Sequence, residues 1–183
     1  MNDRLFTLPK KLAERHHTRD PFVLADLLGF SVRFLDTKVQ KGFCANILNN
    51  YFIFINQNLS PEMQRMTCAH ELGHVLLHKD RLGRDEHGRS RRFVEMVLFN
   101  ITDETEYEAN LFAANLLVDD ETLLELLRSG QDIVAAARAL GVNVNLLAIK
   151  LAEMKKAGLP LNDLPLSPDR TFLGRIADSA GSL

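Results

Sequence analysis

The sequence is poor in the features that mark secreted and membrane proteins. Only two cysteines, Cys44 and Cys68, occur among 183 residues, too few for a disulfide framework of the secreted kind. No apolar run approaches the ~18–20 residues that span a bilayer, and the N-terminal segment 1–17 is too polar for a signal peptide. We therefore expect a reduced, cytoplasmic protein without a membrane partner.

An excess of charge of either sign is also missing. The chain has 22 Lys and Arg against 24 Asp and Glu, a formal net charge of −2, so no global electrostatic argument favours nucleic acid as a partner. The hydrophobic share of 46% is ordinary for a soluble globular protein. The length suits one domain, or one domain with a small appendage, and is enough to bury a core.

One short pattern carries chemistry, the H-E-x-x-H that begins at His70 and ends at His74. On a helix these two histidines lie one turn apart on one face, so both rings can reach the same metal ion. Glu71 stands beside them and can accept a proton from water that the metal activates. A shuffled chain of this composition would contain the pattern with odds of about 1%, so a third ligand and a suitable scaffold must support it.

The surrounding residues place the motif on a well-defined helix. Ser60, Pro61 and Glu62 form a strong helix start, with a cap, a proline at the first position and an acid in the first turn. The helix is expected to run to about His78. Because it is apolar around much of its circumference, it is predicted to be central and buried.

A small sheet is predicted ahead of this helix. Residues 31–36 alternate apolar and polar side chains, as a half-buried strand does. Two apolar runs, 42–48 and 51–56, are joined by two asparagines and predict a β-hairpin. The run 93–101 suits a further strand, with a helix as the alternative.

Helices dominate the predicted second half of the chain. Thr102 caps an acid-rich helix at 103–118. Three shorter helices follow, with glycines at their C-terminal ends, at residues 121–129, 132–140 and 144–157. The last pair has the spacing of a helix-turn-helix, but the second helix is so apolar that packing is favoured over direct DNA binding.

The residues alone leave the third metal ligand open. The position three residues after His74 is Leu77, and no histidine follows at the metzincin spacing, so that pattern is excluded. The common alternative is an acidic residue on a second helix, and the segment 106–114 offers Glu106 and Glu108. These two point about 200° apart around a helix, so only one of them can face the metal.

Two segments together carry a family resemblance. RMTCAHELGHVLLH at 65–78 and ETEYEANLFAANLLV at 104–118 resemble the paired signatures of the ImmA/IrrE-type metallopeptidases. The similarity covers roughly residues 20–118. The chain departs from the family where the second helix ends, because Val118-Asp119 replaces the usual Met-Pro, which puts the exit of that helix in doubt.

The resemblance implies a site and a domain organisation. It points to the wider gluzincin group, in which zinc is bound by two histidines and a downstream glutamate, here Glu106, with Asn110 orienting a zinc-bound histidine. Glu108 is the rival ligand. The implied fold is α+β: a small antiparallel or mixed sheet packed on a zincin-type pair of helices, followed by a helical subdomain. The expected boundaries are a leader helix at 1–19, a metallopeptidase domain at 20–119, helices at 120–158 and an irregular tail at 159–183.

The resemblance also implies an activity. It predicts a cytoplasmic zinc endopeptidase, with Glu71 as general base, that cleaves a regulator such as a helix-turn-helix repressor of a phage or mobile element. Tyr51 and Tyr107 are candidates for stabilising the oxyanion, and strand 51–56 is the expected edge for an extended substrate. One alternative is a non-catalytic metal-binding module that binds protein or DNA. Another is a protease whose cleft is covered by the segment 79–92 or by the tail.

Overall fold

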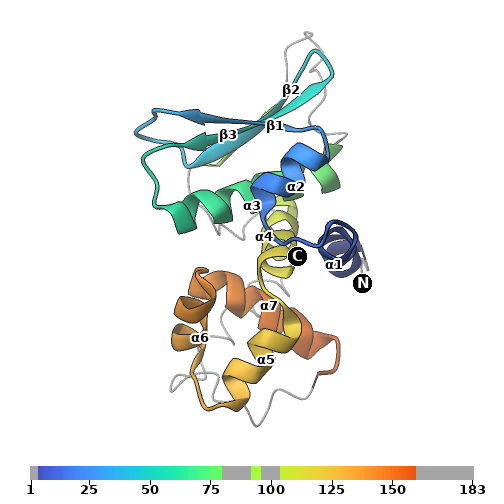
Figure 1. Ribbon diagram of the computed structural model, residues 1–183, viewed down its shortest axis with the longest axis vertical. Helices are drawn as coiled ribbons and strands as arrows, with labels where there is room; N and C mark the ends of the chain where they lie inside the picture. The colour runs from blue at the N-terminus through green and yellow to red at the C-terminus, as the bar shows by residue number, and fades with distance from the viewer. Residues whose placement is uncertain (1–3, 80–91, 96–103, 160–183) are drawn as a thin grey trace. The chain divides into compact units, whose positions relative to one another are not determined.

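A computed structural model describes residues 4–79, 92–95 and 104–159 (Figure 1). Contacts within the chain divide it into two compact units, residues 1–117 and 118–183. The tail expected from 159 onward, most of the charged segment 79–92 and residues 96–101 of the predicted fourth strand lie outside the described residues.

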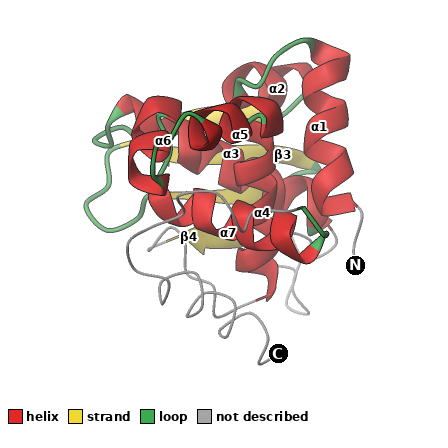
Figure 2. Ribbon diagram, turned by 90° about the horizontal axis from the view of Figure 1, so that it is seen from below, coloured by secondary structure: helices red, strands yellow, loops and turns green. Residues whose placement is uncertain are grey.

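The first unit holds a four-stranded mixed sheet. Its strands are β1 (Ser31–Leu35), β2 (Gly42–Ile47), β3 (Asn50–Asn56) and β4 (Arg92–Glu95), in the spatial order β1-β3-β2-β4. β1 runs parallel to β3, whereas β2 is antiparallel to both β3 and β4. The mixed sheet followed by a helical region confirms the predicted α+β class (Figure 2, strands in yellow and helices in red).

The predicted role of strand 51–56 as a substrate edge is wrong. That strand is β3, which pairs with β1 on one side and β2 on the other, so neither of its edges is available to another strand. Within the described residues, the outer strands of the sheet are β1 and β4. The sequence pattern gave no strand order, because order depends on pairing between segments that are distant along the chain.

The predicted hairpin is present, but its turn comes one residue early. Ile47 pairs with Asn50, and the two residues between them, Leu48 and Asn49, have φ angles of 51° and 63°. Two successive left-handed residues form a type I′ turn, whose twist matches that of the flanking strands. Asn50 therefore begins β3, and its side chain donates a hydrogen bond to the Leu48 carbonyl.

Helix α3 (Pro61–Leu77) carries the motif and lies against the sheet. Ser60 caps it by accepting a hydrogen bond from the Met63 amide, and ten consecutive residues from Met66 to Val75 are buried. A helix that is apolar on all sides has to be enclosed by neighbours. The neighbours are β2 and β3, the short helix α2 (Pro21–Leu27) and helix α4 (Glu104–Leu117). Figure 1 shows α2 and α3 on one side of the sheet.

Helix α4 crosses α3 at very short range. A Cβ added to Gly73 would lie 3.2 Å from the Ala109 backbone and 3.1 Å from the Phe112 ring, so the crossing depends on the absence of a side chain there. Helix α1 (Arg4–His16) packs on α4 through Leu5 and Leu12, and it includes Pro9 within its span. The residues expected to form a leader helix therefore support the helix that carries Glu106.

The described part of the second unit consists of α5 (Asp120–Arg128), α6 (Ile133–Leu140) and α7 (Val144–Lys156). α6 and α7 meet at 113° around Gly141, which has a left-handed φ of 62°. That angle is typical of a helix-turn-helix, yet α7 is buried at every residue from Leu146 to Leu151, which leaves little of it to read DNA. Among the described helices, none is by itself long and apolar enough to cross a membrane; α6 and α7 together meet the length and composition criteria as a bent pair.

Candidate metal centre

The two motif histidines converge as the helical spacing predicts. The Nε2 atoms of His70 and His74 lie 3.0 Å apart, and the ring centroids are 4.7 Å apart. Both side chains are buried, with 1% and 0% of their surface exposed. Two buried imidazole nitrogens that point to the same position are the arrangement expected of two ligands in a candidate metal site.

Glu106 reaches the same point from α4. Its Oε2 lies 3.2 Å from His70 Nε2, and its Oε1 lies 3.2 Å from His74 Nε2. The ligand atoms of these three residues all lie within 4.8 Å of one another, and they form the one such group among the described residues. Glu106 is 19% exposed, so the group has a solvent-facing side.

Asn110, one turn after Glu106, fixes the tautomer of His70. Its Oδ1 lies 2.9 Å from His70 Nδ1, and both side chains are buried. Because an amide oxygen can only accept, His70 Nδ1 must carry the proton. The Nε2 of the neutral ring then keeps its lone pair, which points toward His74 and Glu106.

The donor set fits a divalent metal ion. Two neutral imidazoles and one carboxylate are the three protein ligands of many catalytic zinc sites, which keep a fourth position for water. Burial lowers the pKa of the His74 imidazole to about 4, although Glu106 beside it acts in the opposite direction. The His74 ring is therefore neutral near pH 7, which is the form that binds metal.

Glu71, the expected general base, lies buried between α3 and the sheet. It is 0% exposed. A Cβ added to Gly42 of β2 would lie 3.3 Å from Glu71 Oε1 and would clash with the Thr67 methyl group. Only glycine lets β2 come this close to the carboxylate. Gly42 was not among the predicted site residues, although it lies in the segment that resembles the family, because nothing local in the sequence indicates its contact with Glu71.

Glu108, the rival ligand, faces away from this group. Its Oε2 lies 3.5 Å from Nε2 of His78, one turn beyond the motif, and His78 is itself 8% exposed. The His78 ring lies 5.7 Å from the His74 ring. A second histidine–carboxylate contact, between the C-cap of α3 and α4, therefore stands next to the candidate ligands. The separate sequence signals of its two members did not suggest that they meet.

Tyr51 and Tyr107 remain the candidates for stabilising the oxyanion. Tyr51 makes an edge contact with Phe30, and the Lys79 ammonium lies 5.1 Å above its ring. Tyr107 is half-buried on α4, between Glu106 and Glu108.

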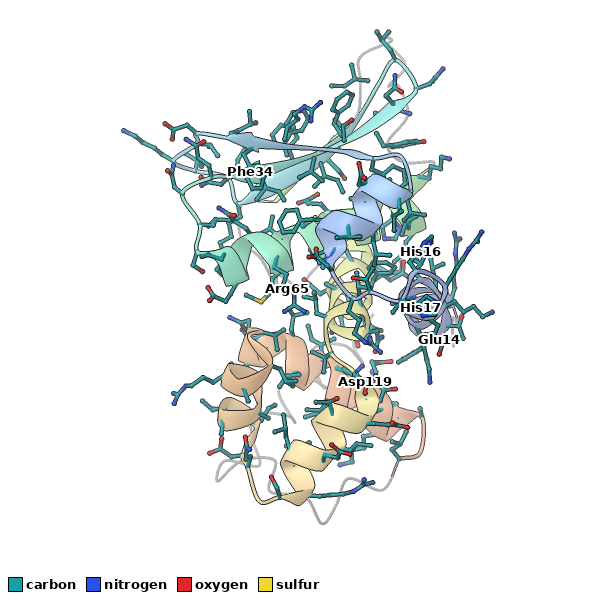
Figure 3. All side chains as sticks on the ribbon, viewed as in Figure 1. Glu14, His16, His17, Phe34, Arg65 and Asp119 are labelled. Carbon is teal, nitrogen blue, oxygen red and sulfur yellow. The ribbon has the colours of Figure 1, made fainter. Side chains whose placement is uncertain are left out.

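The histidines near the N-terminus and the two cysteines are not members of this group. His16 and His17 lie at the C-terminal end of α1 (Figure 3). Cys44 and Cys68 are free thiols and fully buried, and burial raises the pKa of Cys68 well above its usual range. Both cysteines therefore act as small core side chains.

Comparison with known proteins gives a consistent result. The model of the peptidase M78 family, described as the IrrE N-terminal-like domain, matches residues 25–152. An "uncharacterized immunity region protein 2" of Bacillus phage phi105 is 29% identical over 148 residues, covering 80% of this chain and 89% of that protein. Metallopeptidase ImmA of Bacillus subtilis (strain 168) is 36% identical over 80 residues, covering 43% of this chain and 41% of that protein. The family match spans both helices that carry His70, His74 and Glu106.

Proposed function

Because the chain belongs to the IrrE N-terminal-like domain family, we propose that it is a zinc-dependent endopeptidase that cuts a regulatory protein. Membership of this peptidase family and the similarity to metallopeptidase ImmA support a metallopeptidase of this type. The choice of zinc, cleavage within a protein chain and the substrate are the added steps. The observation that carries the proposal is the meeting of His70, His74 and Glu106 within 4.8 Å, on two helices that cross at a glycine.

The proposed ligands have separate tasks. His70 and His74 offer neutral nitrogens, and Glu106 offers a carboxylate that offsets part of the charge of the ion. A zinc ion held there would supply Lewis-acid chemistry, which makes water more acidic and polarises a carbonyl. Asn110 keeps the His70 ring in the tautomer and orientation that binding requires.

Glu71 is the proposed general base and acid. It accepts the proton of the attacking water, and it then delivers that proton to the nitrogen of the leaving amine. The Glu71 side chain is completely buried, which shields it from bulk water. The close approach of β2 at Gly42 limits where the Glu71 side chain can lie.

The names of the relatives support the substrate class. One relative is named for a phage immunity region and the other is named a metallopeptidase. We infer that this chain acts in the cytoplasm on a transcriptional repressor, with a helix-turn-helix repressor encoded beside its gene as the first candidate. Direct DNA binding is not part of the proposal, because α7 is buried along most of its length.

The test combines metal content with cleavage. Purified protein with one zinc per chain is expected to cut the neighbouring repressor at one or a few sites, seen by intact-mass spectrometry. Glu71→Gln, purified in parallel, should retain zinc and lose cleavage by at least ~100-fold, as expected when a general base is removed. Cleavage by Glu71→Gln at the wild-type rate would refute this mechanism. Zinc binding with no cleavage by either protein would favour the non-catalytic regulator instead.

A further inference from the structure

The strand β2 lies against Glu71 and has two edges. One edge pairs with β3 over six residues, and the other pairs with β4 over four. Gly42, at the start of β2, is the residue whose added Cβ would touch Glu71. Any further strand laid beside Gly42 would have to use the edge that β4 occupies, because β3 fills the other.

The register brings the end of β4 closest to this place. Glu95, the last residue of β4, pairs with Gly42, whereas Arg92 at the other end pairs with Ala45. Opposed Cα atoms in an antiparallel pair lie ~4.5–5.5 Å apart. The backbone at Glu95 therefore runs one strand spacing from the residue that adjoins the proposed general base.

We propose that β4 is an internal strand that occupies this edge of β2 and must be displaced before the backbone of an extended peptide substrate can pair there. The inference rests on the proposed endopeptidase function and on the extended, strand-like substrate that the family resemblance implies. The outer edge of β4 is a less suitable binding site for the substrate backbone, because it lies one further strand spacing, about 4.8 Å, from Gly42.

The short pairing between β4 and β2 is consistent with displacement of β4 from the sheet. β4 pairs over four residues, against the six between β2 and β3. Short edge strands contribute few hydrogen bonds and are less firmly held than central ones. Being part of the same chain, however, β4 competes at a millimolar effective concentration. Only peptides that fit the edge well would displace it, which limits cleavage of other extended chains.

The register also provides a way to fix β4 in place. Cys44 of β2 pairs with Phe93 of β4. The Cα separation of opposed residues lies within the range that a disulfide spans. Oxidation of a Phe93→Cys variant should therefore tie β4 to β2. The matched control combines Phe93→Cys with Cys44→Ala, which cannot form this bond and retains Cys68.

Two proline variants weaken the pairing instead. Adjacent residues of a strand direct their N–H groups to opposite edges, so either Phe93→Pro or Val94→Pro removes a hydrogen bond to β2. One of the two prolines therefore removes an N–H that faces β2. The second removes an N–H on the outer edge of β4 and serves as the control. Both prolines disfavour helix equally, so loss of helix propensity cannot explain a difference between them.

The probe is a fluorescein-labelled peptide that copies residues 90–97, since a strand seated on this edge defines a peptide that fits it. All proteins carry Glu71→Gln to prevent cleavage, and each is confirmed to hold zinc. Fluorescence anisotropy measures the Kd of the peptide. One proline variant is expected to bind at least ~10-fold more tightly than the unmodified chain, because its internal competitor is weakened.

The cross-linked Phe93→Cys protein is expected to bind no peptide and to regain binding on reduction. In the control that also carries Cys44→Ala, oxidation should leave the Kd of the peptide unchanged. Equal binding by the cross-linked and reduced forms would overturn the proposal, as would two proline variants that bind no better than the unmodified chain. Because the peptide is bound and not cut, failure of repressor cleavage in the earlier assay would leave this result unaffected.

Discussion

At the scale of single residues, the candidate site depends on groups that are not ligands. Asn110 is the clearest, because its Oδ1 accepts a hydrogen bond from Nδ1 of His70, with 2.9 Å between the oxygen and the nitrogen. Asn110→Ala removes that acceptor, which lets the ring rotate or change tautomer. We expect zinc affinity to fall about 10- to 100-fold, the usual effect of losing such a partner. A competition titration with a chromogenic chelator measures this.

Asn115 offers a matched control for that substitution. It lies on the same helix and donates to the Leu5 carbonyl of α1, away from the metal group. Asn115→Ala should leave zinc affinity within twofold of wild type while lowering the melting temperature. Equal losses of affinity in the two variants would mean that Asn110 acts only through the stability of α4.

Gly42 is the second residue of this kind. Gly42→Ala would place a methyl group against the Thr67 methyl and 3.3 Å from Glu71 Oε1. Overpacking of this sort costs about 1–3 kcal/mol of stability. We expect cleavage to drop more than zinc affinity, because Glu71 is displaced while the ligands are not. Adding Thr67→Ser, which removes the methyl group in the way, should recover part of both stability and cleavage; no recovery would contradict the steric explanation.

At the scale of elements, the site is set by how closely α3 and α4 cross. Gly73→Ala would push against the Ala109 backbone, which cannot yield as a flexible side chain can. Moving α4 away carries Glu106 from the two histidines, so zinc affinity should fall together with about 1–3 kcal/mol of stability. Zinc titration and thermal unfolding of the metal-free protein separate the two effects. Unchanged affinity in a folded Gly73→Ala protein would show that Glu106 adjusts independently of the crossing.

The elements themselves were largely predictable from the sequence. The motif helix was expected from Ser60 to about His78 and is observed as Pro61–Leu77, because its cap and its apolar pattern are local signals. The helix bearing Glu106, expected at 103–118, is observed at Glu104–Leu117, with the acidic first turn that marked its start; its predicted cap, Thr102, lies outside the described residues.

Relations between elements were harder to predict. The central place of β3, the contact of Gly42 with Glu71 and the pairing of His78 with Glu108 each join residues far apart in sequence. Nothing in periodicity or spacing encodes such pairs. The meeting of Glu106 with the histidines was anticipated through the family resemblance, whereas helical geometry alone left Glu108 as an alternative.

At the scale of the whole molecule, the candidate donor atoms belong to one unit, and a buried lysine, Lys150, belongs to the other. His70, His74 and Glu106 lie in unit 1–117. In unit 118–183, the ammonium of Lys150 is 1% exposed, bonds the Val118 carbonyl at 3.0 Å and pairs with Asp120. Lys150 therefore joins α7 to the start of α5.

This separation predicts that zinc and Lys150 stabilise different parts of the chain. Zinc at 1,000 times its Kd stabilises whatever binds it by ~4 kcal/mol, so calorimetry should show one unfolding transition that rises with zinc. Lys150→Met removes a charged hydrogen bond worth about 1.5–3 kcal/mol and should lower a second transition while zinc affinity is unchanged. If a single transition both rises with zinc and falls with Lys150→Met, the two units unfold as one, since a cooperative molecule spreads each local change over the whole chain.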